Sequence, residues 1–239
     1  MKKTILTVAW IFTIAAARAT TVLWSAANDT GIVDASTNGT DNKGVVVAQG
    51  NLVRLGYFTI SDAAVSLAKT NPSLLSSTSW HVIADTTIGI GTNLPGSFSL
   101  SSPVTLAAGD FGHQIYIWVL NAPTVGAATQ QAIFYEPATG LPGQFNANWA
   151  FPGSNGPTIS TTIDIGQAKT SLGGTYLAGS YQTSNASATT TFGAATGAVK
   201  LEAVVPEPST FTLFALAAAA GAGLRRRSRL NPFGGALSN

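Results

Sequence analysis

The chain has 239 residues, of which only 9% are charged and none is cysteine, so disulfides, thiolate metal sites and cysteine nucleophiles are excluded. The formal net charge of +2 misleads, because seven of the twelve basic residues lie near the two ends of the chain. Residues 20–204 hold five basic and nine acidic residues, and five minus nine gives −4, so no partnership with nucleic acid is expected.

The first nineteen residues have the pattern of a secretory signal peptide. Two lysines follow the initial methionine, and residues 4–17 form an apolar stretch of fourteen residues. Ala17 and Ala19 then supply the small residues that a signal peptidase site requires, and the stretch is short for a transmembrane helix. We therefore predict a signal helix at residues 1–19 and a mature chain that begins near Thr20.

Short strand-like runs recur through residues 20–204, separated by clusters of Gly, Pro, Asn and Ser. The run at 114–121 is densest in β-branched and aromatic residues, which favours a central strand. One helix is predicted at 61–69, with Ser61 as its N-cap. The predicted strands are 21–25, 44–48, 52–59, 79–84, 97–100, 114–121, 131–135, 158–164, 175–182 and 198–203. These patterns predict one mainly β extracellular domain over residues 20–204, a β-sandwich or jelly-roll-like fold.

The loop that begins at Asp34 resembles the start of a calcium-binding loop. Asp34, Ser36, Asn38 and Asp41 place oxygen atoms at near-alternate positions, with a glycine for the turn. The twelfth position is Val45, so the bidentate glutamate of such loops is missing. An Asx-rich hairpin loop explains the same residues. Asp34, Asn38 and Asp41 are therefore only a weak calcium candidate, and no confident metal site or cofactor is predicted.

No motif for catalysis appears in the body. His81 and His113 are the two histidines, and no Gly-x-Ser-x-Gly nucleophile elbow accompanies them. Glu136 fits a turn least well among the acids, but glycoside hydrolysis needs a pair of carboxylates. We predict that the body is not an enzyme, and we keep a glycoside hydrolase that uses Glu136 as the weakest alternative.

Aromatic side chains offer another kind of site, because exposed rings can stack on sugars. The body contains Trp24, Trp80, Trp118 and Trp149, and rings of this size most often fill a core. Trp149 lies in a loop-like stretch between asparagines and a proline, so it is the candidate sugar contact. A carbohydrate-binding module on a β-sandwich is therefore the main alternative to a structural role.

The end of the chain has three parts in a fixed order. Residues 205–210 read Val-Pro-Glu-Pro-Ser-Thr, and the prolines favour a stiff, extended segment. Residues 209–224 are then uncharged and predict a hydrophobic helix, about 24 Å long at 1.5 Å per residue, which is short for a membrane span. Four arginines follow and would hold such a helix in the inner membrane with the arginines on the cytoplasmic side: Arg225, Arg226, Arg227 and Arg229.

This order resembles the PEP-CTERM sorting domain over residues 205–229. In that family an exosortase of the inner membrane recognises and processes the tail, so the resemblance implies that Pro206, Glu207 and Pro208 carry the recognition. The family usually ends near the arginines, whereas residues 230–239 continue here as a predicted disordered tail. The resemblance implies an exported protein, anchored transiently in the inner membrane and then placed at the cell surface or released.

The body is also similar to a group of small PEP-CTERM proteins from Verrucomicrobia-like bacteria, on the segments 51–58, 114–121 and 149–152. That group contributes no activity. The family setting implies a structural or adhesive role in a biofilm or exopolysaccharide layer. Sparse charge also suggests self-association.

Overall fold

The computed structural model describes residues 19–26, 30–36, 44–107, 109–136, 149–151, 161–183 and 197–204. The predicted signal helix, apart from Ala19, lies outside these described residues. The sorting tail, from residue 205 onward and with its predicted hydrophobic helix, also lies outside them. Within the described ranges, no helix combines the length and the apolar content that a membrane crossing requires.

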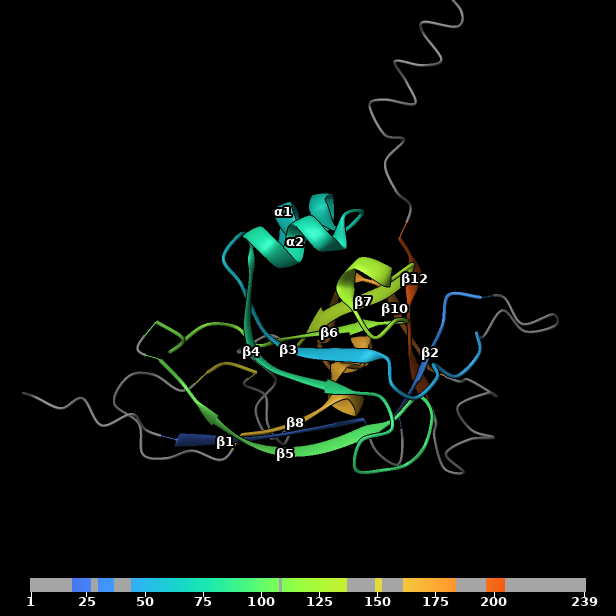
Figure 1. Cartoon of the computed structure of the whole chain (residues 1–239), viewed down its shortest axis with the longest axis horizontal. Coiled ribbons are helices and arrows are strands. Elements are labelled where there is room, and N and C mark those ends of the chain that lie inside the picture. The colour runs from blue at the N-terminus through green and yellow to red at the C-terminus, as the bar shows by residue number, and fades with distance from the viewer. Residues whose placement is uncertain are drawn as a thin grey trace, which may run out of the picture.

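The described chain folds into three β-sheets (Figure 1), so the fold is mainly β, as predicted. The largest sheet has the order β12 (Glu202–Ala203), β7 (Gln130–Tyr135), β6 (Tyr116–Leu120), β3 (Leu52–Phe58) and β4 (Trp80–Thr87), and β9 (Thr175–Ala178) also pairs with β7. A second sheet has the order β5 (Phe98–Thr105), β1 (Ala19–Ala26) and β8 (Thr161–Asp164), and a third has β10 (Ser180–Gln182), β11 (Gly197–Lys200) and β2 (Thr30–Val33).

The sheets are arranged in layers, which is consistent with the predicted β-sandwich. In Figure 1, β1, β5 and β8 lie on one side of the largest sheet, and the helices lie on the other side. Most neighbouring strands are antiparallel, whereas β1 with β8 and β11 with β2 are parallel pairs. Apolar residues of all three sheets belong to one contiguous core, so burial of their side chains holds the layers together.

Aromatic rings supply much of this core. Trp24 of β1 meets Phe98 of β5 edge to face, with ring centroids 5.3 Å apart. In the largest sheet, Trp118 of β6 contacts Trp80 and Phe58, with centroids 5.5 Å and 6.0 Å away. The Trp118 ring nitrogen donates to Gln131 Oε1 at 2.9 Å, so this fully buried indole keeps its hydrogen bond.

Two short helices, α1 (Asp62–Ala68) and α2 (Pro72–Thr78), connect β3 to β4. The predicted helix is confirmed as α1, and Ser61 is its N-cap, since its hydroxyl oxygen accepts from Ala64 N at 3.4 Å. The second helix, α2, was not predicted. Asn71 caps it by accepting from Leu74 N at 3.1 Å, and Pro72 occupies its first turn, where a missing N–H costs nothing.

Three strand predictions need correction. Residues 44–48 form only an isolated bridge, between Val46 and Val33, although β2 beside them is a strand that was not predicted. The run at 175–182 divides into β9 and β10 at Gly179, whose φ of +76° breaks an extended strand. The run at 198–203 divides into β11 and β12 at Leu201, whose N–H donates to Val33 O instead of to a neighbour in the largest sheet. Short 3₁₀ turns, η1 (Val125–Ala127), η2 (Ile165–Ala168) and η3 (Thr170–Leu172), complete the connections.

Candidate functional site

The C-terminal tail leaves the body from an edge of the largest sheet. β12 is antiparallel to β7, with Glu202 opposite Gln131 and Ala203 opposite Gln130. The next residue is also held, because Val204 N donates to Thr129 O at 2.8 Å. The residue at which the tail begins is therefore fixed by the backbone hydrogen bonds of the sheet.

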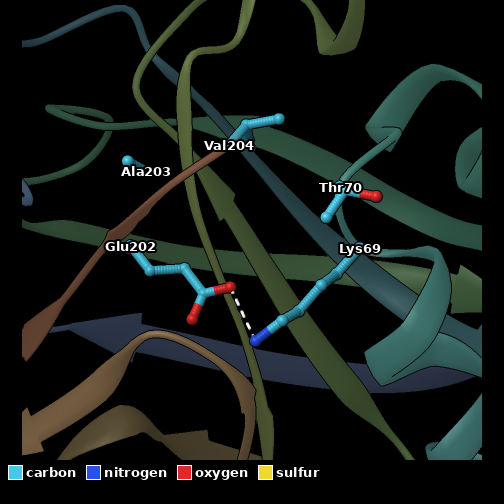
Figure 2. A pocket seen from close by; sticks show the side chains of 5 residues that line it. All are labelled: Lys69, Thr70, Glu202, Ala203 and Val204. Atoms are coloured by element: carbon cyan, nitrogen blue, oxygen red, sulfur yellow. Dashed lines mark ion pairs between the residues drawn. The ribbon is translucent and has the colours of Figure 1, made fainter. Parts of the chain in front are cut away.

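Side chains reinforce this attachment. Glu202 Oε1 pairs with Lys69 Nζ at 2.8 Å, and Figure 2 shows the two side chains extended toward each other from β12 and from the end of α1. The other carboxylate oxygen, Oε2, accepts from Gly179 N at 3.0 Å. Both oxygens of Glu202 are therefore bonded, one to the helical segment and one to the turn between β9 and β10.

A small open pocket of about 280 Å³ lies at this place (Figure 2). We call its five lining residues the tail junction: Lys69, Thr70, Glu202, Ala203 and Val204. Lys69 and Glu202 form an ion pair across the pocket, and this pair connects the end of α1 to β12. The tail junction thus joins the start of the tail to the end of α1.

A second group of functional side chains gathers around Tyr57 on β3, and we call Tyr57, His81, Asp110 and His113 the histidine cluster. His81 lies directly opposite Tyr57 on β4, and their rings stack with centroids 4.7 Å apart. The ring of His113 also stacks on that of Tyr57, with ring centroids 4.0 Å apart and an interplanar angle of 6°. A side chain at Gly56 would meet His81 O at 2.1 Å, so this glycine allows β4 to approach.

Asp110 connects the histidine cluster through hydrogen bonds. Its Oδ1 accepts from Tyr57 OH at 3.2 Å and lies 3.1 Å from His81 Nε2, while its Oδ2 accepts from Ala107 N at 2.6 Å. The Asp110 side chain is 5% exposed, whereas that of His81 is 48% exposed. Burial, together with the bond to Asp110, raises the pKa of Tyr57, so its hydroxyl remains a donor at neutral pH.

The histidine cluster has a hydrolase-like element, because a buried aspartate orients an exposed imidazole. The contacts of His81 are to Tyr57 and Asp110, and neither is a hydroxyl nucleophile of the serine type. β4 and β6 flank β3 on opposite sides, so Tyr57 separates His81 from His113, which precedes β6. Across the described part of the chain, no three His, Cys, Asp or Glu residues are placed to hold a metal ion.

Glu136, the acid singled out in the sequence, lies buried at the end of β7. It is 3% exposed, and its Oε2 has no hydrogen-bond partner. Burial raises the pKa of this carboxyl to about 7. Burial is the whole cause, so the shift gives no sign of the second carboxylate that glycoside hydrolysis would need.

Trp149, the candidate sugar contact, lies in the interior of the protein. Trp149 is 0% exposed, and its ring contacts Phe134 with centroids 6.1 Å apart. Its carbonyl oxygen accepts from Ile115 N at 2.7 Å and from the side-chain amide of Gln114, which draws this segment onto the largest sheet. The ring therefore adds apolar area to the core and offers no face to a sugar.

The calcium candidate is only partly described. Asn38 and Asp41 lie outside the described residues, whereas Asp34 is visible directly after β2. Asp34 Oδ1 accepts from Ser36 N at 3.0 Å and from Val45 N at 2.8 Å. This oxygen therefore closes its own loop, as in an Asx turn. The calcium site stays a weak prediction.

Sequence reasoning missed both the tail junction and the histidine cluster. Lys69 and Glu202 lie 133 positions apart in the chain, and neither belongs to a sequence motif that predicts an ion pair. Asp110 has the local sequence pattern of an ordinary turn acid, because Gly109 and Gly112 flank it. The backbone bond from Asp110 N to Ala107 O confirms the turn, but the pattern could not reveal what the carboxylate contacts.

Comparison with known families identifies the segment that begins at the tail junction. Residues 204–227 match the family described as the PEP-CTERM protein-sorting motif. They are 24 of the 239 residues, so the match characterises the tail and leaves the body unassigned. Comparisons with curated proteins and with solved structures found no match. The kinship with proteins of Verrucomicrobia-like bacteria stays a prediction.

Proposed function

We propose that this chain, which carries a PEP-CTERM protein-sorting motif at residues 204–227, has a structural or adhesive body in the surface layer or biofilm matrix of the producing cell. The motif itself indicates an exported protein that is anchored at its C-terminus until an exosortase processes it. In this proposal the mature body is non-enzymatic, and it remains at the cell surface or in the exopolysaccharide after processing.

The main observation behind this proposal is that the first residue of the sorting motif is hydrogen-bonded to the largest sheet. Val204 is the first residue of the motif and donates its N–H to Thr129 O. The body therefore reaches the motif without an intervening linker. Cleavage beyond Val204 would leave every contact of the tail junction in place, so an intact body could be delivered.

The structural role is supported by the edge of the largest sheet. β4 ends the strand order, and Val82 on it is 41% exposed. An edge strand can pair with another chain through its backbone groups. Self-association through β4 is therefore part of the proposal, since it would let neighbouring copies build a layer.

The carbohydrate-binding alternative has less support, because it requires a row of exposed aromatic rings on one sheet face. Among the described residues, the tryptophans are all buried: Trp24, Trp80, Trp118 and Trp149. Tyr57 and Tyr116 are buried as well, at 6% and 7% exposed. Binding to exopolysaccharide would then depend on polar contacts or on many weakly bound copies.

Mass spectrometry of the native protein, fractionated into medium, envelope and matrix, tests the proposal. We expect a protein that has lost the residues beyond the Pro-Glu-Pro segment and is found in envelope or matrix. A variant with Pro206, Glu207 and Pro208 replaced by alanine should keep its C-terminus and stay in the inner membrane. An intact wild-type C-terminus in the inner membrane would mean that the tail is a plain anchor.

Light scattering of the purified body tests the self-association. We expect oligomers that grow with concentration and are reduced by Val82→Lys, since a lysine on an edge strand opposes pairing. The control is Val45→Lys, which changes an equally apolar residue of 52% exposure that lies outside the strands. A monomer at high concentration would contradict the layer-building part of the proposal.

A further inference from the structure

The sorting motif allows very little chain between the body and the membrane. Val204 is held in the sheet, and the uncharged segment of the tail begins at Ser209. Five residue steps separate them, and an extended chain spans at most about 3.6 Å per step, or roughly 18 Å in total. While that segment lies in the bilayer, Val204 must therefore be close to the lipid surface.

This limit determines which surface of the body faces the lipid. The tail junction places Lys69 and Thr70 beside Val204, and these two residues lead directly from α1 into α2. Figure 1 shows the end of β12 on the same side of the largest sheet as α1 and α2. We call residues 61–79, which contain both helices, the helical cap.

The helical cap has a nearly uncharged outer surface that exposes two leucines. Leu67 on α1 is 80% exposed, the highest value among the exposed large apolar residues of the described chain, and Leu74 on α2 is 52% exposed. Single exposed leucines are common on soluble proteins. These two leucines are distinguished by their place, because they lie one on each of the two helices that Lys69 and Thr70, beside Val204, connect.

Both charged residues of the helical cap have partners within the protein. The Asp62 carboxylate accepts from Tyr116 OH and from Tyr135 OH, each at 2.6 Å, so it is turned toward the sheet. Lys69 is paired with Glu202. The remaining polar groups are serines, threonines and one asparagine, which the hydrated headgroup region accommodates.

We propose that the helical cap lies on the outer face of the inner membrane while the sorting tail is inserted, with Leu67 and Leu74 in the lipid interface. This inference rests on the proposed function, since it requires the anchored state that precedes processing. Interfacial helices bury their apolar face by roughly 5–10 Å at the boundary between headgroups and acyl chains. The contact would fix how the body presents the Pro-Glu-Pro segment to the exosortase and would end when the tail is cut.

Single-cysteine labelling can test this contact cleanly, because the chain has no cysteine of its own. The full chain is made as Leu67→Cys or Leu74→Cys, labelled with an environment-sensitive fluorophore and mixed with vesicles of phosphatidylethanolamine and phosphatidylglycerol. The matched control is Leu94→Cys, a leucine of 43% exposure in the turn between β4 and β5, which Figure 1 shows on the side away from the helices. Flotation with the vesicles reports insertion of the tail independently.

We expect blue-shifted emission and loss of quenching by iodide at positions 67 and 74, with no change at position 94. A reporter at the exposed residue Ser66, introduced as Ser66→Cys, should show the same shift. It should lose the shift when Leu67→Asp and Leu74→Asp are added, although the protein still floats.

The outcomes separate the two proposals. Protein that does not float with the vesicles would contradict the membrane-anchored state of the proposed function. Protein that floats while positions 67 and 74 stay open to iodide would overturn the helical-cap contact alone. A shift that appears without vesicles and grows with concentration would assign the surface to a second copy and would also overturn the contact.

Discussion

At the scale of single residues, two buried carboxylates have opposite surroundings. Asp110 receives three hydrogen-bond donors, whereas one oxygen of Glu136 receives none. A buried charge without partners is costly, and a carboxyl in such a place takes up a proton instead. The two acids should therefore respond differently to pH and to neutral substitution.

Glu136→Gln should remove a pH dependence of stability. The folded pKa of Glu136 is raised from 4.5 to about 7, so the folded protein holds this proton more tightly than the unfolded chain does. The stabilisation is therefore complete below about pH 4.5 and is lost as the pH rises through about 7. At pH 8.5 we expect Glu136→Gln to be more stable than wild type, by on the order of 1–2 kcal/mol after solvent screening.

Urea unfolding at pH 5 and at pH 8.5 measures this difference. The difference should be much smaller at pH 5, where both side chains are neutral in the folded protein. A difference of the same size at both pH values would show that the ionisation of Glu136 is not its cause.

Asp110→Asn should destabilise the protein by about 1–3 kcal/mol, because the buried acceptor for Tyr57 and His81 loses its charge. Thermal unfolding monitored by tyrosine and tryptophan fluorescence measures the loss. His113→Ala is the comparison within the histidine cluster, since His113 is exposed and contacts Tyr57 through ring stacking. Its loss should stay below about 1 kcal/mol, and equal losses would contradict the central role given to Asp110.

At the scale of elements, β12 is a two-residue strand that could not persist on its own. Its position depends on β7 beside it and on Glu202, which reaches both Lys69 and the turn at Gly179. A Cβ at Gly179 would meet Lys200 O at 2.5 Å, so the absence of a side chain lets that turn approach closely. The attachment of the tail is thus a property of three elements together.

Glu202→Ala should loosen β12 more than Lys69→Ala does. The glutamate substitution leaves Gly179 N without its acceptor and removes the ion pair, whereas the lysine substitution removes only an ion pair whose side chains are 29% and 33% exposed. We expect losses on the order of 1–2 kcal/mol for Glu202→Ala and below about 1 kcal/mol for Lys69→Ala. Hydrogen exchange at Val204 should rise in the same order, and the reverse order would contradict the role assigned to Glu202.

At the scale of the whole molecule, the described body ends at the tail junction, where the sorting motif begins. The main core contains residues of all three sheets and extends in sequence as far as Leu201, which is 2% exposed. The body should therefore keep its stability when the tail is cut, provided that the cut falls after the tail junction.

A chain that ends at Val204 should unfold at the same urea concentration as the full chain. A chain that ends at Lys200 should be less stable by about 2 kcal/mol or more, because it lacks buried Leu201 together with β12 and its bonds. Chemical unfolding followed by tryptophan fluorescence compares the two truncations. If both truncations matched the full chain, the tail junction would not contribute to the fold.

Local features of the sequence were sufficient to place most strands, to place α1 and to identify the sorting tail. β-branched runs between turn residues indicate strands, Ser61 indicates a helix start, and the order of motif, apolar segment and arginines characterises the tail. α2 could also have been predicted, because Asn71 followed by Pro72 is a helix-start signal.

Only the tertiary structure decided which residues meet. The order of strands in the largest sheet brings His81, Asp110 and His113 around Tyr57, and it places Glu202 beside Lys69. The same order covers Trp149, although its neighbours in sequence are those of a loop. A residue's local pattern records its own element, whereas burial and side-chain partners depend on pairings between segments far apart in the chain. For that physical reason the sequence by itself determined that the chain carries a sorting motif, and the tertiary structure decided how the body holds Val204, where that motif begins.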